Sequence, residues 1–461
     1  MAHYQAHRGQ GQLTSNDAST IVAQTTPQGR GGIGIVRLSG PLAYSILNRI
    51  SGERKFTPRK AHFCHFKDDL DRLIDTGLGL FFPRPFSFTG EDVAEFQVHG
   101  SPHVLDMLIE QAIKLGARLA QAGEFSYRAL LNDKIDLTQA EAIADLIDAG
   151  SRQAARLASL SLNGVFSHRI QGLLDQLVHL RLHLEADFDF SENEIEFLSC
   201  SQLHEKLFRL MGQYDAVIAS AKLGRLMQEG LKLVLAGRPN AGKSSLLNCL
   251  TGQDSAIVTE IPGTTRDTLH EQINLDGIPL QIIDTAGLRE SEDPIELLGI
   301  ARTRKAMQTA DQLLWILDDS LDEAQQIPED LPEGIDLTLI RNKIDLSLSP
   351  AGVLSQQPWV EIGVSAKTGA GMEALREQIK KNAGLRENDQ GEFIARRRHL
   401  QALARGRGHV QQAQELNQAQ LGRELIAEEL RLAQSALGEI TGEFSSDDLL
   451  GEIFSRFCIG K

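Results

Sequence analysis

The chain has 461 residues, enough for about three domains that each bury a hydrophobic core. Its 62 acidic residues outnumber its 47 basic residues and give a net charge of −15, which argues against a large unspecific nucleic-acid-binding surface. Four scattered cysteines without a CxxC pair argue against a disulfide framework and a zinc site, and 5% aromatic residues argue against a base-stacking platform.

The amino terminus is polar. Residues 1–15 contain no apolar run of the kind found in a signal peptide, and we predict a disordered arm there. No stretch of the sequence approaches the roughly 18 apolar residues that cross a membrane. We therefore expect a soluble, cytoplasmic protein that does not contact a membrane.

Short β-branched runs alternate with helical runs from Thr20 to about Lys134. Helices are expected from Pro41 and from Pro102 to about Leu115. The predicted strands have the sequences TIVAQT, IGIVRL, GLGLFF and DVAEFQV. This alternation predicts a small α/β domain.

The pattern changes at Thr138, where apolar residues begin to recur at three- and four-residue spacing. The spacing predicts helices up to Gly230, interrupted only around residues 188–201. The stretch TQAE, which begins at Thr138, predicts a capping box at the start of the first helix.

A second α/β pattern begins with LKLVLAG at Leu231 and continues to about Asn382, and residues 392–457 return to long amphipathic helices. We favour an α/β domain inserted into one helical domain, whose two halves bury their apolar faces against each other. Two separate helical domains remain the alternative.

The stretch GRPNAGKS, Gly237 to Ser244, follows the strand KLVLA and precedes the helical run SLLNCL. This is a phosphate-binding loop: its glycines let backbone N–H groups surround phosphates, Lys243 reaches the outer phosphates and Ser244 offers a hydroxyl to Mg²⁺. A strand before the motif and a helix after it make a chance match improbable.

Three further motifs follow in the order expected of a guanine-nucleotide domain. PGTTRD (262–267) supplies Thr265 as a second hydroxyl, and DTAG (284–287) follows the strand LQIID. In NKID (342–345), the Asp345 carboxylate can accept the N1 and N2 hydrogens of guanine, and SAK (365–367) lies on the O6 side. Adenine would leave that carboxylate without its partners.

The residue after DTAG is Leu288, which cannot orient a water molecule as the glutamine of Ras-like enzymes does. No arginine finger is evident, since Arg266 and Arg289 fit solvated surface positions equally well. The charge between the β- and γ-phosphates still requires a cation, and the amide oxygen of Asn240 could hold a monovalent ion. A loop-stabilising turn residue is the alternative role of Asn240.

The stretch GRGGIG (29–34) satisfies GxGxxG, but a β-branched run follows it where a dinucleotide site needs a helix. We expect a turn between strands there, or a close approach of a flat ligand. Charged residues end or interrupt elements of the same domain at Arg37, Glu95 and Lys134. Periodicity favours a solvated strand face for Glu95.

Together these motifs resemble one family. The segments STIVAQTTPQGRGGIGIVRLSG, SFTGEDVAEFQVHG, GEFSYRALLNDKIDLTQAEAIADLI, GRPNAGKSSLLN, IPGTTRD, DTAGLRE and the final FCIGK are similar to the MnmE (TrmE) family of tRNA uridine modification GTPases. The similarity extends from about Thr20 to the last residue.

The resemblance implies an α/β plus all-α fold with a Ras-like P-loop GTPase domain inserted into the helical domain. Its domains would be a tetrahydrofolate-binding and dimerisation domain at 16–134, a helical domain at 135–229 and 384–461, and a GTP-binding domain at 230–383.

The resemblance also assigns roles to residues. Mg²⁺ would be held by Ser244 and Thr265, and K⁺ by Asn240, Thr259, Ile261 and Thr264, so that the ion replaces the missing arginine. Catalysis would involve Lys243, Glu296 as the water-orienting carboxylate, and Cys458. Folate contacts would be Arg37, Glu95, Lys134 and Lys461. The implied GTP-binding residues are Asn240, Ala241, Gly242, Lys243, Ser244, Ser245, Thr259, Glu260, Ile261, Pro262, Gly263, Thr264, Thr265, Asp284, Thr285, Ala286, Gly287, Asn342, Lys343, Ile344, Asp345, Ser365, Ala366 and Lys367.

The family works as a homodimer and as a heterotetramer with MnmG, a partner that carries FAD, and it modifies C5 of the wobble uridine of certain tRNAs with a tetrahydrofolate one-carbon donor. One departure is Pro262, which replaces a small residue but leaves the carbonyl of Ile261 in place. The tail would return to the folate pocket, with Cys458 as nucleophile or proton donor. A packing cysteine is the alternative.

A regulatory GTPase switch in ribosome assembly or RNA binding is the competing hypothesis. Such a factor would carry a basic RNA-binding domain after the GTPase domain, whereas here only ARRRHL (395–400) is basic. We interpret that run as a solvated helix face.

Overall fold

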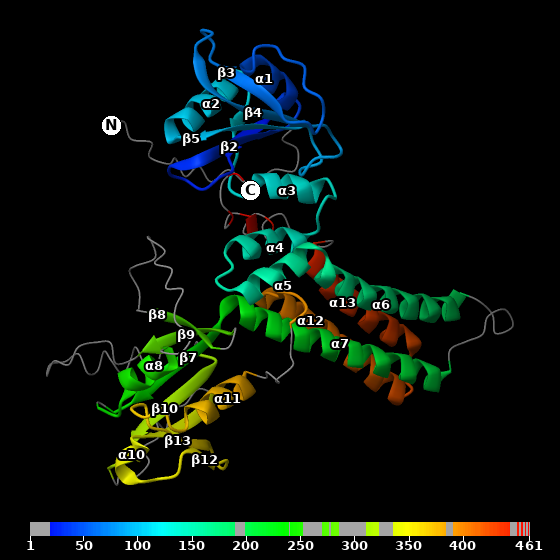
Figure 1. The fold of residues 1–461 in the computed structure, drawn as a ribbon. Coiled ribbons are helices and arrows are strands. Elements are labelled where there is room, and N and C mark those ends of the chain that lie inside the picture. Colours follow the sequence, from blue (N-terminus) through cyan, green and yellow to red (C-terminus); the bar gives the residue numbers. More distant parts are fainter. Residues whose placement is uncertain are drawn as a thin grey trace, which may run out of the picture. The chain divides into compact units, whose positions relative to one another are not determined.

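The computed structural model describes residues 19–189, 199–238, 240–251, 270–275, 278–284, 310–321, 335–383, 391–442, 450, 453–454, 457 and 460. The predicted arm, residues 1–15, lies outside these ranges. The chain divides into two compact units. Figure 1 shows the chain coloured by residue number. Unit 1 comprises residues 1–144 and 437–461, and unit 2 comprises residues 145–436. The domain boundaries expected from the sequence stay predictions.

A six-stranded sheet forms the centre of unit 1, in the order β3–β4–β5–β2–β1–β6. Neighbouring strands are antiparallel, except that β1 and β6 run parallel. The strands are β1 (Ile21–Gln24), β2 (Gly31–Ser39), β3 (His62–Lys67), β4 (Leu73–Phe82), β5 (Val93–Gly100) and β6 (Arg118–Leu119). The four predicted strands are confirmed. Strand β3 was not predicted because its sequence HFCHFK contains no β-branched residue.

Two helices, α1 (Ala43–Ile50) and α2 (Pro102–Lys114), cover one face of this sheet. Alternate strand residues such as Leu38 and Phe96 point into that core and meet Ile46. The opposite face receives α3 (Glu124–Leu131), whose Phe125 packs against β1.

The carboxyl-terminal segment packs on α3 within unit 1. The rings of Tyr127 and Phe454 meet edge to face with their centroids 5.3 Å apart. The cluster around them joins α3, the tail and α4 (Leu137–Ile147), and it contains Tyr127, Leu137, Ala140, Leu450, Ile453, Phe454 and Phe457. The tail is thus held by burial of apolar side chains.

The capping box predicted at Thr138 is wrong. Helix α4 begins one residue earlier, so Thr138 lies inside its first turn. The reciprocal pair is Asp136 and Gln139: Gln139 N donates to Asp136 Oδ1 at 2.9 Å, and Asp136 N donates to Gln139 Oε1 at 3.0 Å. Aspartate caps a helix at least as well as threonine does. The overlapping stretch DLTQ, which begins at Asp136, therefore forms the capping box in place of TQAE.

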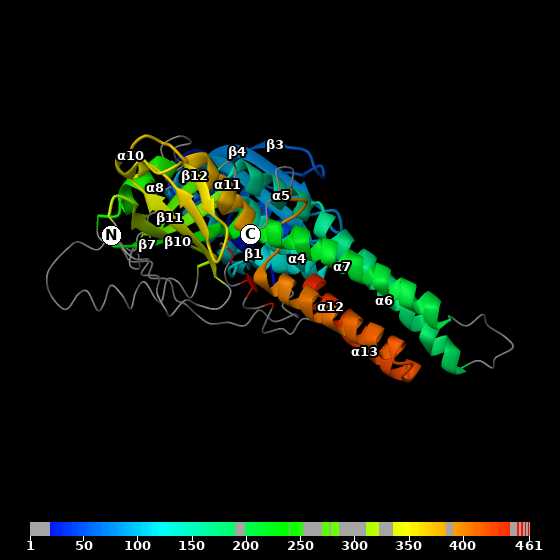
Figure 2. The same ribbon diagram turned by 90° about the horizontal axis from the view of Figure 1, so that it is seen from below.

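Unit 2 contains a set of long helices. Figure 2 shows them running side by side, and α7 packs along α12. They are α6 (Val165–Asp189), α7 (Cys200–Glu229), α12 (Arg397–Gln418) and α13 (Arg423–Thr441), joined by the shorter α5 (Arg152–Leu162). The last five residues of α13 belong to unit 1. The contact between α7 and α12 is close, because a Cβ added at Gly406 would lie 2.9 Å from the hydroxyl of Tyr214.

The segment before α12 is anchored in the helices. Ile394 N donates to Ser161 Oγ at 2.8 Å, and the Phe393 ring stacks on Phe166 with centroids 4.6 Å apart. Arg396 Nη2 lies 2.7 Å from Asp145 Oδ1. The interpretation of the basic run as a solvated face is therefore wrong for Arg396.

A seven-stranded sheet occupies the rest of unit 2, in the order β12–β13–β11–β10–β7–β9–β8. It is parallel except at its two edge pairs. Its strands are β7 (Leu231–Gly237), β8 (His270–Leu275), β9 (Ile278–Asp284), β10 (Gln312–Asp318), β11 (Asp336–Asn342), β12 (Gly352–Ser355) and β13 (Val360–Gly363). Helix α8 (Lys243–Thr251) follows β7, α10 (Ile344–Ser347) lies between β11 and β12, and α11 (Met372–Asn382) follows the last strand, β13.

Both faces of this sheet are buried, which explains why LKLVLAG reads as a continuous apolar run. Leu233 and Leu235 of β7 belong to one core cluster, whereas Val234 and Ala236 belong to another. The predicted fold class, α/β combined with all-α segments, is confirmed. The central strand β7 brings its carboxyl end between those of β9 and β10, and this edge is where ligands of parallel α/β sheets bind.

Candidate functional site

The loop between β7 and α8 has the backbone that phosphate binding requires. Asn240 has φ +64° and Gly242 has φ +91°, so the chain turns tightly before the helix. Gly237 has φ +148°, and a Cβ there would collide with the backbone of Ile316. The loop therefore lies against the end of β10, and α8 begins immediately after it with its N–H groups directed at the loop.

Lys243 lies at the centre of this loop. Its Nζ donates to the carbonyl oxygens of Gly237 and Arg238, each at 2.8 Å, and the residue is 8% exposed. A buried ammonium group needs such acceptors. The side chain thus curls back over the loop, from where a phosphate oxygen could take over part of its hydrogen bonding.

Asn342, the last residue of β11, joins two of the predicted motifs. Its Nδ2 donates to Ala241 O at 2.9 Å, and its Oδ1 accepts from Ala366 N at 3.2 Å. The side chain is buried at 2% exposure. It therefore connects the phosphate loop to the SAK segment.

Asp345 is held in place by the SAK segment as well. Ser365 Oγ donates to Asp345 Oδ1 at 2.7 Å and also accepts from Thr368 N at 3.2 Å. Ser365 is fully buried. This leaves the second carboxylate oxygen of Asp345 for other donors, as recognition of guanine requires.

Lys343 adopts a left-handed backbone with φ +67°, and its Nζ lies 2.6 Å from Asp318 Oδ2 at the end of β10. Partial burial would raise the pKa of Asp318, but hydrogen bonds from Lys343 and Ser320 outweigh it and hold that pKa below its usual range. The sequence offered no motif for Asp318. Asp318 ends β10, the strand next to β7, so its position at the same sheet edge indicates that it lies near the site.

The structure thus brings together the described residues of the phosphate loop, of NKID and of SAK at the carboxyl edge of the sheet. Of Asp284, only the backbone at the end of β9 is described. The following predicted residues lie outside the described residues: Thr259, Glu260, Ile261, Pro262, Gly263, Thr264, Thr265, Thr285, Ala286, Gly287, Glu296, Cys458 and Lys461.

A second group of predicted residues meets on the sheet of unit 1. Arg37 of β2 lies directly opposite Glu95 of β5 in the strand register, and Arg37 Nε donates to Glu95 Oε1 at 2.9 Å. Glu95 is 8% exposed, so the interpretation of this residue as part of a solvated strand face is wrong. A strand-period pattern cannot show that an arginine on the neighbouring strand neutralises the acid.

Aromatic rings flank this ion pair. The Arg37 guanidinium lies 5.8 Å from the ring centre of Phe88 and 5.9 Å from that of Phe125. Lys134 is exposed, and its Cε lies 3.2 Å from the position that a Cβ at Gly90 would take. Lys134 therefore lies beside the loop that carries Phe88.

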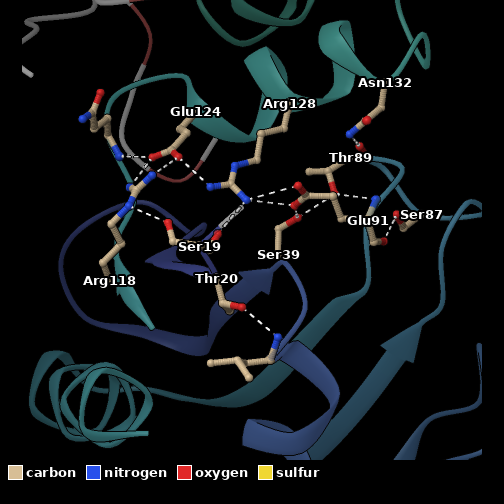
Figure 3. A network of polar contacts seen from close by, with 12 residues as sticks. Ser19, Thr20, Ser39, Ser87, Thr89, Glu91, Arg118, Glu124, Arg128 and Asn132 are labelled. Atoms are coloured by element: carbon tan, nitrogen blue, oxygen red, sulfur yellow. Dashed lines mark hydrogen bonds and ion pairs between the residues drawn. The ribbon is translucent and has the colours of Figure 1, made fainter. Parts of the chain in front are cut away.

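Sequence reasoning missed a charged network next to these residues. Figure 3 shows Arg128 between Glu124 and Glu91, with Arg118 on the far side of Glu124. Burial would raise the pKa of Glu124, but hydrogen bonds from Arg118 and from Gln121 N, together with the charges of both arginines, lower it. The i,i+4 pair within EFSYRALL was the available signal in the sequence.

The tail ends in the same unit. Gly460 has φ +101°, and a Cβ there would collide with the backbone of Gln24 at the end of β1. Gly123 has φ +67°, and a Cβ there would lie 2.8 Å from Phe454 O. Two glycines thus allow the tail to lie directly on the first strand and on the start of α3.

The glycine-rich stretch from Gly29 to Gly34 forms the end of the β1–β2 loop and the first part of β2, as expected for a turn between strands. An open cavity of about 260 Å³ lies beside it, lined in part by Gln24, Arg30 and Leu105. No helix in the described part of the chain has both the length and the apolar character needed to cross a membrane.

Two family profiles match this chain. A family profile described as the MnmE helical domain matches residues 137–458, and one described as the GTP-binding protein TrmE N-terminus matches residues 20–134.

Curated relatives are similar over nearly the full length. The tRNA modification GTPase MnmE of Vibrio cholerae serotype O1 is 52% identical over 451 residues, which is 96% of this chain and 99% of that protein. The protein of the same name from Proteus mirabilis is 52% identical over 97% of this chain and 100% of its own, and that of Shewanella denitrificans is 52% identical over 96% and 99%. The chain therefore belongs to the MnmE family of tRNA modification GTPases.

Proposed function

We propose that this chain is a potassium-dependent GTPase that acts in tRNA modification. With a flavin-bearing partner, MnmG, it would install an aminomethyl or carboxymethylaminomethyl group at C5 of the wobble uridine, using a tetrahydrofolate one-carbon donor. Membership of the MnmE family supports hydrolysis of GTP and tRNA as substrate. We also assign the potassium ion, the folate and the partner to this chain.

The main support for this proposal is the hydrogen bond from Asn342 to Ala241, which connects the proposed base-recognition motif to the phosphate loop. With Asp345 held by Ser365, the site offers a carboxylate to a guanine and a lysine to the phosphates. Because Asn342 joins the NKID motif to the phosphate loop, the site can hold the base and the phosphates of one nucleoside triphosphate at a fixed separation.

Oxygen-donating side chains suit the two proposed ions. Ser244, at the first turn of α8, offers a hydroxyl oxygen, and Mg²⁺ takes oxygen ligands together with substrate phosphates. Asn240 is exposed in the loop and offers a neutral amide oxygen. Oxygen dipoles of this kind can replace the hydration shell of K⁺. The remaining proposed ligands, Thr265 for Mg²⁺ and Thr259, Ile261 and Thr264 for K⁺, lie outside the described residues.

The bound K⁺ would supply the positive charge that an arginine finger supplies in other GTPases. The protein's own part is positioning. Lys243 would hold the phosphates, Asp345 would hold the base, and Glu296 would orient the attacking water.

The Arg37–Glu95 pair fits a reduced folate. A pterin carries an N–H group and an amino group on one edge of its pyrimidine ring. A carboxylate such as that of Glu95 can accept hydrogen bonds from both groups. The rings of Phe88 and Phe125 provide apolar surface beside it. Lys134 and Lys461 would pair with the carboxylates of the ligand's glutamate, and Cys458 would lie near the transferred carbon. We further propose that the chain works as a homodimer in the cytoplasm.

The test is GTP hydrolysis in KCl and in NaCl at equal ionic strength. We expect hydrolysis to be faster in K⁺, and we expect Asn240→Ala to remove the difference without abolishing GTP binding, because Lys243 and Asp345 remain. The control is Asn48→Ala in α1 of unit 1, which is not part of the proposed nucleotide site. Equal rates in both salts would refute the role of the ion.

A further inference from the structure

Arg128 is a buried cation that none of the roles above uses. Its side chain is 6% exposed. Its Nη1 donates to Ser19 O at 2.9 Å and to Glu91 Oε2 at 3.0 Å, and its Nη2 donates to Glu124 Oε1 at 2.9 Å (Figure 3). One guanidinium thus joins Ser19, two residues before β1, to the β4–β5 loop and to the first turn of α3.

The β4–β5 loop, here residues 83–92, is held at several points by this network. The Glu91 carboxylate also accepts from Ser39 Oγ at 2.7 Å, and Ser39 lies 2.6 Å from Thr89 Oγ1. Asn132 Nδ2 donates to Thr89 O at 2.7 Å. The loop is therefore attached to α3 at two points, through Arg128 in the second half of the helix and through Asn132 at its C-cap.

The same loop and helix carry the residues that surround the proposed folate site. Phe88 of the loop and Phe125 of α3 flank the Arg37 guanidinium. Gly90 of the loop lies against the side chains of Lys134 and Asn132. A shift of the loop away from α3 would therefore move Phe88 from Arg37 and open the space beside Lys134.

We propose that Arg128 is a positioning residue of the folate site, and that its bond to Glu91 holds the β4–β5 loop against α3 in the geometry that a reduced folate needs. This proposal rests on the proposed binding of tetrahydrofolate to unit 1. Arg128 itself would not touch the ligand. It would act through Phe88 and the loop backbone, as residues behind a binding site fix the side chains that contact the ligand.

The charge balance of the network makes the proposal testable. Without Arg128, Glu124 still has Arg118 at 2.6 Å and Glu91 still has Ser39. The substitution Arg128→Met keeps the length and the apolar stem of the side chain but removes the link between the two carboxylates. The double variant Arg128→Met with Glu91→Gln removes one charge of each sign, so it restores neutrality without restoring the link.

The experiment uses the full chain and measures tetrahydrofolate affinity by calorimetry under reducing conditions. We expect Arg128→Met to bind tetrahydrofolate about ten- to a hundredfold more weakly, and Arg128→Lys to recover part of the affinity because an ammonium still donates to Glu91. Hydrogen exchange of peptides from residues 83–92 should become faster in Arg128→Met. The control Ile46→Val destabilises the core on the opposite face of the sheet and should leave the affinity unchanged.

The double variant separates positioning from simple stabilisation. We expect it to recover the melting temperature lost in Arg128→Met while the tetrahydrofolate affinity stays low. Recovery of both would mean that Arg128 only balances charge, and wild-type affinity in a folded Arg128→Met would overturn the proposal directly. If the wild-type chain binds no tetrahydrofolate, whereas it still binds GTP, the proposed folate function fails instead.

Discussion

Asn342 Nδ2 donates to the carbonyl oxygen of Ala241 at 2.9 Å, so the NKID motif, to which we assign base recognition, is hydrogen-bonded directly to the proposed phosphate-binding loop. The two residues are about a hundred positions apart in the chain: Ala241 lies in the loop after β7, and Asn342 is the last residue of β11. The groups that we propose for base recognition and for phosphate binding are therefore joined in one hydrogen-bonded site.

Replacement of Asn342 by alanine should weaken GTP binding. It leaves the buried Ala241 O and the partly buried Ala366 N without their partner, at a cost of about 1–3 kcal/mol for a fully buried group and less for a partly buried one. We expect GTP affinity to fall by about tenfold or more, measured by equilibrium titration with a fluorescent GTP analogue.

Asn382→Ala is the matched control for this prediction. Asn382 of α11 is hydrogen-bonded to Gln378 on the same helix and to Thr338 of β11. Its loss should therefore lower stability without lowering nucleotide affinity. Equal losses of affinity in both variants would mean that Asn342 has no special part in the site.

Replacement of Asp345 by asparagine should change which base is bound. The amide oxygen of the new side chain can still accept from Ser365, which leaves its NH₂ group facing the nucleotide. Xanthine carries an oxygen where guanine carries an amino group, so the variant should hydrolyse xanthosine triphosphate and should bind GTP about a hundredfold more weakly or worse. Unchanged preference for GTP in competition assays would contradict the role of Asp345.

The contact between Tyr214 and Gly406 predicts a pair of stability changes in the helices of unit 2. Burial raises the pKa of the Tyr214 phenol, and the hydroxyl has no hydrogen-bond partner among the described residues. Tyr214→Phe should therefore be neutral or stabilising by up to about 1 kcal/mol. Gly406→Ala should destabilise by about 1–3 kcal/mol, because its methyl group would overlap that hydroxyl.

Gly408→Ala provides the control on the same helix. A Cβ at Gly408 meets no atom within 4 Å, so this change should stabilise α12 by about 0.5–1 kcal/mol. Thermal unfolding followed by helical circular dichroism measures all three variants. In the double variant with Tyr214→Phe, part of the loss caused by Gly406→Ala should return, and strict additivity would refute the contact.

The position of the phosphate loop, NKID and SAK at one edge of the sheet could be predicted because each motif is local in the sequence. Lys243 and Ser244 belong to a motif that begins at the end of one strand, and Asp345 belongs to a four-residue motif at the end of another. Each motif is placed by the strand that precedes it, so a parallel sheet brings them to one edge. What the pattern could not predict was the bond from Asn342 to Ala241.

The unit 1 network could not be predicted for the opposite reason. Arg128 and Glu91 are 37 residues apart and share no motif. Glu95 was misjudged because its neutralising partner, Arg37, lies on another strand, and the register between β2 and β5 is not visible in either segment alone. Long-range ion pairs depend on how elements pack, whereas periodicity reports only one element at a time.

The lowered pKa of Glu124 predicts a pH dependence of the stability of unit 1. A carboxyl group whose pKa is lower in the folded than in the unfolded chain contributes stability above its unfolded pKa, about 4.3, and loses it as pH falls through the folded value. Glu124→Gln should therefore be less stable than wild type at pH 6, and the difference should shrink below about pH 4.

Pulse-labelling hydrogen exchange of α3 peptides during urea unfolding measures this difference for unit 1 alone. Glu53→Gln, at an exposed ion pair with Arg49, is the control and should show little difference at any pH. A gap between Glu124→Gln and wild type that stays constant from pH 6 to pH 3 would contradict the stabilising role of the ionised carboxylate.

The most direct test of the account is nucleoside analysis of tRNA from cells that lack the protein. We predict unmodified wobble uridine in the deletion strain, restoration of the modified nucleoside by the wild-type chain, and no restoration by Lys243→Ala, which loses its grip on the phosphates. Wobble uridine that is fully modified without the protein, or that is restored equally by Lys243→Ala, would contradict a role for its GTP hydrolysis in tRNA modification.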